Sequence, residues 1–270
     1  MLNKQIGFIG AGNMGSAIIG GIIRSGLVTP AQIIASAHTS STLERLTAEF
    51  SIRTTLSNEE VAANSDILFL AVKPNKFAEV IPQIASSVKP SCVIVSIAAG
   101  QSISDIEAAF GRPICLVRAM PNTPALVGEA MSALCTNAAV SEEDLKDVVA
   151  IFNAFGKCEV ITENLMDAVI GVSGSSPAYV YLFIEAMADA AVADGMPRAQ
   201  AYKFAAQAVL GSAKMVLDTG KHPGELKDAV CSPGGTTIEA VAALEAGGFR
   251  NAVISAQRAC SKKSRDMSKH

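Results

Sequence analysis

Apolar residues in the first 120 positions fall into short runs that alternate with longer, helix-like segments. The runs are rich in β-branched side chains and are bounded by glycine, proline or polar residues, which is typical of strands. The predicted strands are 4–9, 32–36, 66–72, 91–98 and 114–120, and the predicted helices lie near 14–25, 41–50, 75–86 and 102–110. Since the runs are apolar on both faces, they predict a mostly parallel sheet with helices on both sides.

The pattern changes at Glu163, after which long alanine-rich segments replace the short runs. Just before this point the sequence predicts a strand at 133–137, a helix near 141–155 and a strand at 158–162. Glycine and proline then divide the second half into successive helices. These are 163–172, 177–195, 197–220, 222–230, a helix from 236, and 248–267. The predicted architecture is an α/β domain over residues 1–162 and an all-α domain over residues 163–270.

Half of the residues are hydrophobic and only 17% are charged, which is apolar for a soluble monomer. A membrane span needs about 20 consecutive apolar residues. The best candidate, 178–193, carries Glu185 and Asp189 on one helical face. We therefore expect a cytoplasmic protein that hides the apolar surface of its second half in a subunit interface.

Charge and cysteine spacing bear on whether the protein binds nucleic acid or metal ions. The net charge of −3 provides no basic field for nucleic acid, and the basic tail 258–270 is interpreted as a solvated helix end. The six cysteines show no C-x-x-C pair and no histidine at ligand spacing. We expect reduced thiols, no metal site and no nucleic-acid partner.

The first predicted strand leads directly into GFIGAGNMGSAI, residues 7–18. Gly10, Gly12 and Gly15 form a G-x-G-x-x-G pattern between this strand and the following helix. Glycines there permit a tight turn and close approach of a pyrophosphate to the helix N-terminus. The motif predicts a Rossmann-type, dinucleotide-binding N-terminal domain, and a glycine-rich packing turn is the alternative interpretation.

The end of the second strand bears on the choice of cofactor. An NAD site usually places Asp or Glu there, about 20 residues after the glycines, to bind the ribose hydroxyls. The segment 35–42 reads ASAHTSST and contains no acid. Its small donors favour the 2′-phosphate of NADP(H), with Arg45 as a helper from the next helix. NAD(H) stays the alternative, and a solvated polar loop explains the serines equally well.

Two more strand ends, AVKPN at 71–75 and SIAAG at 96–100, lie where open α/β sheets bind ligands. Lys73 and Pro74 break the strand sharply, which would aim backbone groups at the nicotinamide-side ribose. A plain strand-to-helix turn explains the same residues.

A ketone reductase needs an acid for the nascent alkoxide, and this chain offers no evident one. Tyr179, Tyr181 and Tyr202 lack a lysine four residues later. The histidines are terminal (His270), at a helix start (His222) or on the predicted phosphate loop (His38). A protonated imine accepts hydride without a new proton in that step, so positioning suffices. The sequence therefore favours imine reduction over alcohol oxidation.

The segment GVSGSSPAYV, 171–180, resembles the helix-start motif of β-hydroxyacid dehydrogenases, but Val180 stands where that family carries its catalytic lysine. The motifs GFIGAGNMGSAI, AVKPN, SIAAG, RAMPNTPALVG, SGSSPAYVYLFIEA and DAVCSPGGTTIEAV together resemble pyrroline-5-carboxylate reductases. The resemblance spans about residues 5–262. It implies NAD(P)H-dependent reduction of 1-pyrroline-5-carboxylate to L-proline, the last step of proline biosynthesis, by hydride transfer to the imine carbon. It also implies a homodimer through the C-terminal helices and, as an alternative, a decamer.

The resemblance also assigns roles to individual residues. It places at the cofactor Gly10, Ala11, Gly12, Asn13, Met14, Gly15, Ser36, Ala37, His38, Thr39, Asn58, Val72, Lys73, Pro74, Ala98, Ala99, Met120, Pro121 and Asn122. It places at the substrate Glu163, Ser232, Pro233, Gly234, Gly235, Thr236 and Thr237. Thr237 is the implied catalytic residue, as hydrogen-bond partner of the ring nitrogen.

The stretch CSPGGTTIEAV, 231–241, interrupts the helical half with residues that disfavour a helix interior. We interpret Pro233–Gly235 as a turn into a helix whose N–H groups bind the substrate carboxylate. A threonine-capped elbow between two helices is the alternative for the motif. For the whole chain, the alternatives are a β-hydroxyacid-dehydrogenase-like oxidoreductase and a non-catalytic NADP(H)-binding sensor.

Overall fold

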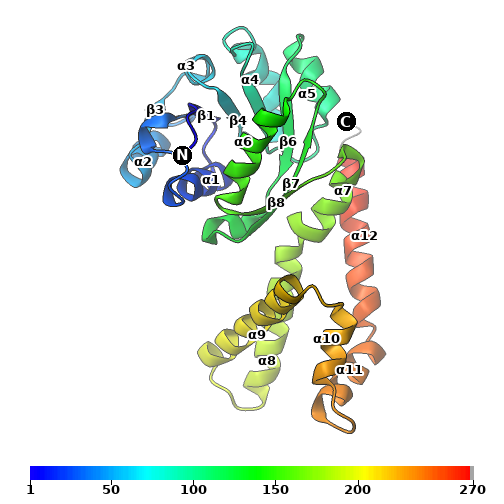
Figure 1. The fold of residues 1–270 in the computed structure, drawn as a ribbon. Coiled ribbons are helices and arrows are strands. Elements are labelled where there is room, and N and C mark those ends of the chain that lie inside the picture. The colour runs from blue at the N-terminus through cyan, green and yellow to red at the C-terminus, as the bar shows by residue number, and fades with distance from the viewer. Residues whose placement is uncertain (268–270) are drawn as a thin grey trace. The chain divides into compact units, whose positions relative to one another are not determined.

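The computed structural model describes residues 1–267 of the 270-residue chain. These residues form two compact units. The first unit comprises residues 1–174 and the end of the last helix from Cys260, and the second comprises residues 175–259. Figure 1 gives the labels of the elements in both units.

An eight-stranded sheet forms the centre of the first unit, with strand order β3-β2-β1-β4-β5-β6-β7-β8. The strands are β1 (Ile6–Ile9), β2 (Ile33–Ser36), β3 (Arg53–Thr55), β4 (Ile67–Leu70), β5 (Val93–Ser96), β6 (Cys115–Met120), β7 (Ala130–Thr136) and β8 (Gly156–Val160). All neighbouring strands pair in parallel except β6 and β7, which are antiparallel. The order of the first six strands is that of dinucleotide-binding Rossmann domains.

Helices cover both faces of this sheet (Figure 1). They are α1 (Asn13–Arg24), α2 (Ser40–Phe50), α3 (Asn58–Ala63), α4 (Phe77–Ile84), α5 (Ile103–Phe110) and α6 (Glu142–Asn153). Successive strand residues alternate between two cores, because side chains of a strand point to opposite faces. Phe8 and Phe69 pack with α1, α2 and α6 on one face. Ile9 and Leu70 pack with α3, α4 and α5 on the other, so the predicted two-sided sheet is confirmed.

The strand β3 and the helix α3 were not predicted. β3 has three residues at the sheet edge, none of them buried, so it lacks the apolar run that identifies a strand. The helix α3 does carry a local signal, since Ser57 caps it and its hydroxyl accepts a hydrogen bond from Glu60 N–H at 3.1 Å. A serine followed three residues later by glutamate is a common helix start.

Residues 163–174 are helical throughout but change type twice. A 3₁₀ turn (Glu163–Leu165) leads into α7 (Met166–Val169), and a π-helical turn follows at Ile170–Gly174. Met166 is buried beside Ala133 and Cys135 of β7. The compact unit therefore continues to Gly174, while the functional boundary predicted near residue 162 stays a prediction.

The second unit is all helical. It contains α8 (Ser176–Ala193), α9 (Arg198–Thr219), α10 (Pro223–Val230), α11 (Thr236–Ala246) and the greater part of α12 (Phe249–Met267). Pro177 and Pro223 occupy the first turns of α8 and α10, where a missing N–H costs nothing. The predicted succession of helices is confirmed.

The last turns of α12 confirm one expectation in part. The tail was expected to be a solvated helix end, and the basic residues Arg258, Lys262, Lys263 and Arg265 are exposed on α12. Ser261 and Ser264 of the same turns are buried. The Ser264 hydroxyl donates to Asp167 Oδ1 at 2.6 Å, which fixes this face of α12 against α7. Residues 268–270 of the predicted tail, which include His270, lie outside the described residues.

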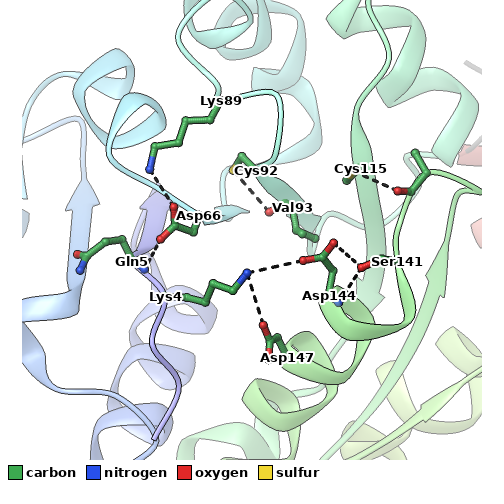
Figure 2. A network of polar contacts seen from close by, with 11 residues as sticks. Lys4, Gln5, Asp66, Lys89, Cys92, Val93, Cys115, Ser141, Asp144 and Asp147 are labelled. Carbon is green, nitrogen blue, oxygen red and sulfur yellow. Dashed lines mark hydrogen bonds and ion pairs between the residues drawn. The ribbon is translucent and has the colours of Figure 1, made fainter.

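A polar network lies where the strands β1, β4 and β5 begin (Figure 2). The Asp66 carboxylate accepts from Gln5 N–H and pairs with Lys89 Nζ, both at 2.8 Å. Lys4 Nζ lies 3.8 Å from carboxylate oxygens of both Asp144 and Asp147. These groups satisfy one another, so the amino-terminal edge of the sheet is occupied by structural contacts.

Candidate cofactor and substrate site

The carboxyl ends of the parallel strands meet at the opposite edge of the sheet, and most of the predicted cofactor residues gather there. Residues 10–15 follow β1, 72–74 follow β4 and 98–99 follow β5, while 36–39 begin with the last residue of β2 and 120–122 begin with the last residue of β6. This edge is where open α/β sheets bind ligands, because loops diverge there and helices begin.

The three glycines of the fingerprint occupy three different environments. Gly10 has φ of +81°, and a Cβ atom there would lie 2.7 Å from Val72 Cγ1. A Cβ at Gly15 would lie 3.1 Å from the Gly10 carbonyl oxygen, which explains the close approach of helix and strand. A Cβ at Gly12 would meet nothing within 4 Å. Gly10 and Gly15 therefore serve the turn and its packing, while Gly12 faces open space that a ligand can use.

The helix α1 begins directly after Gly12. No side chain caps this end, and its first turn contains no acidic residue. The first N–H groups of a helix lack intrahelical partners and carry partial positive charge. Together with the open space at Gly12, these N–H groups can donate hydrogen bonds to a phosphate oxygen, so the residues present fit a dinucleotide.

The loop after β2 is built in two layers. Ser36 is buried, and its hydroxyl donates to Asn58 Oδ1 at 2.7 Å, while Asn58 Nδ2 donates to Gln83 Oε1. His38 and Thr39 are exposed above this layer, and Thr39 caps α2 by accepting from Thr42 N–H. Ser36 and Asn58 thus support the loop from below, and His38 and Thr39 present its polar surface.

Arg45 links this loop to the fingerprint. Its Nη2 donates to the Ala11 carbonyl at 3.3 Å and to Ser16 Oγ at 3.2 Å, and its Nη1 pairs with Glu49 at 3.0 Å. The guanidinium is half exposed, and it reaches from the helix after the predicted 2′-phosphate loop to the fingerprint turn. Arg45, the helper predicted from the sequence, thus adds a cation next to a loop segment, 35–42, that itself contains only small neutral donors and a histidine.

The residues after β4 and β6 differ in the burial of their side chains. Lys73 is exposed at the start of a 3₁₀ turn that begins with Pro74. Asn122 is buried, and its amide donates to the Ser173 carbonyl and accepts from Met131 N–H, both at 3.0 Å. The Met120 side chain lies against Gly174, since a Cβ added there would be 3.1 Å from Met120 Cε. Asn122 therefore joins the end of β6 to the π-helical turn.

Glu163 was predicted to meet the substrate, and the structure gives its carboxylate two protein partners. Oε1 accepts from Ile103 N–H at 2.8 Å and from Arg118 Nη1 at 2.7 Å. Burial first, and the Glu163 carboxylate second, raise the pKa of the neighbouring Cys135 thiol to about 11. Cys135 is therefore a neutral thiol at physiological pH and offers no thiolate nucleophile.

Arg118 is the residue that the sequence reasoning missed. It is 7% exposed, in the middle of β6. The signal was present, because a charged residue in the apolar run ICLVRAM needs a partner once the strand is buried. Only the fold brings Glu163, 45 residues later, to that position.

The motif of residues 231–241 forms a turn and a helix start within the second unit. Gly235 N–H donates to the Ser232 carbonyl at 3.1 Å, and Gly234 has φ of +67°. Proline followed by a glycine with positive φ is the sequence of a type II turn. α11 begins at Thr236 with no side chain capping it, and Thr236 is exposed while Thr237 is half buried. The predicted turn into a helix is confirmed.

Within residues 1–267, no group of His, Cys, Asp or Glu side chains could hold a metal ion. No helix among these residues is long and apolar enough to span a membrane. Strand order, glycine turn and uncapped helix define a Rossmann-type dinucleotide-binding protein with a helical second part.

Comparison with known proteins identifies the family. The chain is 56% identical to pyrroline-5-carboxylate reductase of Escherichia coli (strain K12), over 99% of this chain and all of that protein. It therefore belongs to the pyrroline-5-carboxylate reductase family. A pyrroline-5-carboxylate reductase of Methanosarcina acetivorans is 46% identical over the full length of both chains. The crystal structure of Plasmodium falciparum pyrroline carboxylate reductase with NADP bound matches with a TM-score of 0.90 and 35% identity, over 99% of each chain.

Two family models divide the chain in agreement with this. Residues 5–100 match a model described as NADP oxidoreductase, coenzyme F420-dependent. Residues 163–267 match a model described as pyrroline-5-carboxylate reductase dimerisation. The first match covers the glycine fingerprint, and the second covers the helical half with the Pro233–Gly235 turn.

Proposed function

We propose that this protein reduces 1-pyrroline-5-carboxylate to L-proline with NADP(H), as the last step of proline biosynthesis. The observation that carries the proposal is the full-length relationship to the Escherichia coli enzyme. The local geometry of both motifs supports it. The fingerprint leaves space at Gly12, and α11 starts without a side-chain cap.

The carboxyl edge of the sheet holds the cofactor in this proposal. The start of α1 binds the pyrophosphate, and the ends of β4, β5 and β6 line the nicotinamide half through 72–74, 98–99 and 120–122. When bound, the reduced nicotinamide supplies the hydride. Because Asn122 is held through its side-chain amide, its contribution to this surface is made by its backbone.

Preference for NADP(H) over NAD(H) comes from the loop after β2. His38 and Thr39 offer exposed donors, and Arg45 adds a guanidinium that is anchored on Ala11 and Ser16. A guanidinium matches phosphate geometry, whereas an acid that would favour a ribose hydroxyl is absent from 35–42.

The Ser232–Thr237 segment binds the substrate. The N–H groups at the start of α11 donate hydrogen bonds to the substrate carboxylate, and the Thr237 hydroxyl hydrogen-bonds the ring nitrogen. A protonated imine is already electrophilic, so the protein needs to orient it rather than to donate a strong acid's proton. This accounts for the lack of a Tyr–Lys pair and for Val180 at the helix start.

The assembly proposed is a homodimer through residues 163–270, with a decamer as a larger form, in the cytoplasm. The dimerisation model matches this region, and the second unit exposes most of its large apolar side chains. The functional division is accordingly residues 1–162 for the cofactor and 163–270 for substrate and dimerisation.

An assay with pyrroline-5-carboxylate tests the proposal. We expect substrate-dependent loss of the reduced nicotinamide's absorbance, faster with NADPH than with NADH. Thr237→Ala should lower kcat/KM by about 10- to 100-fold, or roughly 1.4–2.7 kcal/mol. Thr237→Ser keeps the hydroxyl and should stay close to the parent enzyme.

Each outcome separates the alternatives. A normal rate for Thr237→Ala removes Thr237 from the mechanism. NADPH binding without turnover on any cyclic imine indicates a sensor instead. Oxidation of β-hydroxyacids in place of imine reduction indicates the dehydrogenase alternative.

A further inference from the structure

The loop between β5 and α5, residues 97–102, carries Ala98 and Ala99 of the proposed cofactor surface. Its two ends touch the two members of one ion pair. At the start of the loop, Ser96 is the register partner of Arg118 in the neighbouring strand β6. At its end, Ile103 N–H donates to Glu163 Oε1 at 2.8 Å. The pair Arg118–Glu163, with Nη1 and Oε1 2.7 Å apart, therefore spans the base of this loop.

Burial makes this pair unlike the surface ion pairs of the chain. The Arg118 side chain is 9% exposed, and the Glu163 side chain is 36% exposed. Buried charges lose hydration that their mutual attraction only partly restores, so such a pair is a weak source of stability. Its better-attested use is to fix one arrangement among several. Here the arrangement it fixes includes a loop that lies outside the helices and strands and contains Gly100 at φ of +75°.

We infer that Arg118 and Glu163 are positioning residues that hold the loop 97–102 in the conformation that receives the cofactor. This inference rests on the proposed function, because it takes the loop as part of the NADP(H) site. Glu163 then acts through Arg118 and Ile103, and not as a ligand of the substrate. Its bonded oxygen already accepts from both of these partners.

The inference is tested by titrating the purified full-length protein with NADPH. The fluorescence of NADPH reports binding and gives its Kd. Arg118→Met and Glu163→Gln should each raise Kd about tenfold, which corresponds to about 1.4 kcal/mol. The double variant should be no weaker than the weaker single variant, because either change already breaks the pair. Arg118→Lys keeps the charge and should recover part of the affinity.

Lys89→Met is the matched control. It removes an ion pair to Asp66 whose 2.8 Å length is close to that of Arg118–Glu163, at the opposite edge of the sheet (Figure 2). We expect a lower Tm and an unchanged Kd for NADPH. A cofactor effect limited to the Arg118 and Glu163 variants separates positioning from general loss of stability.

Three results would overturn the inference. The first is a lower Tm with unchanged Kd in both single variants, which means a purely structural pair. The second is a higher KM for pyrroline-5-carboxylate in Glu163→Gln alone, with Kd for NADPH unchanged and Arg118→Met normal, which makes Glu163 a substrate ligand. The third is a normal Kd for NADPH in the double variant. The double variant buries no unpaired charge, so it decides the question even if a single variant fails to fold. Absence of NADPH binding in the parent protein would instead refute the proposed function, and the inference with it.

Discussion

The two units of the molecule differ in how far they bury their apolar side chains. In the first unit, both faces of the sheet are covered, and strands such as β1, β2, β4 and β5 are buried at every position. In the second unit, whose residues 175–259 are all described, only Ala188, Ala201 and Ala205 are buried. The first unit completes its core within one chain, whereas the second unit offers apolar surface that this chain does not cover.

That surface consists of large side chains spread over several helices. Those exposed in the second unit are Val180, Tyr181, Leu182, Phe183, Tyr202, Phe204, Leu210, Met215, Leu217, Val230, Ile238, Leu244, Phe249, Val253 and Ile254. A helix that is apolar all round belongs in an interior. The matching dimerisation model names the partner that such helices have in relatives, a second subunit.

A charge on this surface gives the sharpest test of the comparison, and the largest expected effect. Leu182→Glu places a carboxylate on α8 at a side chain that is 67% exposed in one chain. If a second copy covers α8, each buried carboxylate costs about 3 kcal/mol or more, and symmetry introduces two of them. We expect dissociation to monomers in size-exclusion chromatography with light scattering.

Leu56→Glu is its control, because Leu56 is 63% exposed in the first unit. This change should leave the assembly and the Tm nearly unaltered. Equal behaviour of the two variants would mean that the two units do not differ in what covers them.

Phenylalanine truncations compare the two kinds of core. Phe69 is fully buried in β4 and stacks on Phe8 with ring centroids 4.7 Å apart. Phe69→Ala should cost about 3–5 kcal/mol, and this loss should not depend on protein concentration. Phe204 on α9 is 67% exposed in one chain, so Phe204→Ala should weaken the assembly, with a loss of Tm that shrinks as protein concentration rises. Thermal melts over a range of concentrations would show whether this contrast holds.

The open space at Gly12 tests whether the first unit leaves room for a ligand. Gly12 has φ of −71°, so Gly12→Ala is compatible with the backbone, and its Cβ meets no protein atom within 4 Å. The free energy of unfolding should change by less than about 0.5 kcal/mol. The Kd for NADPH should rise about 30-fold, or roughly 2 kcal/mol, by titration.

Gly10→Ala, in contrast, should lower the stability of the fold. Its φ of +81° and its 2.7 Å approach to Val72 Cγ1 should cost about 1–3 kcal/mol of stability. A stable Gly10→Ala protein, or normal NADPH affinity in Gly12→Ala, would contradict these assignments.

The smallest expected effect concerns Asp66, at the amino-terminal edge of the sheet (Figure 2). Partial burial acts to raise the pKa of Asp66, but the hydrogen bond from Gln5 and the Lys89 ammonium outweigh it, so the pKa lies below its usual range. The carboxylate therefore stabilises the fold at pH values above the ordinary aspartate pKa, and this contribution is lost as the pH falls below about 4. Asp66→Asn should cost about 0.5–1 kcal/mol at neutral pH, after allowance for solvent screening, and almost nothing near pH 2. Urea denaturation at both pH values checks this, and an undiminished difference in acid would contradict it.

Much of the first unit could be predicted, because its signals are local. Apolar runs identified the buried strands, and Gly10, Gly12 and Gly15 located the turn before α1. The short edge strand β3 was not predicted, because none of its residues is buried. Ser36 looked like a surface donor, yet the fold buries it and gives its hydroxyl to Asn58.

Sequence by itself therefore determined which segments are strands and helices, where the nucleotide turn lies and which family the motifs resemble. These follow from periodicity and from backbone preferences of glycine and proline, which act over a few residues. Tertiary structure decided that Arg118 pairs with Glu163, that Arg45 reaches Ala11, and that Ser264 binds Asp167. These pairs join residues tens of positions apart in the sequence. The geometry of the folded sheet and helices decides which groups come within hydrogen-bonding distance. A buried charge or hydroxyl needs a partner, and the fold determines which one is available.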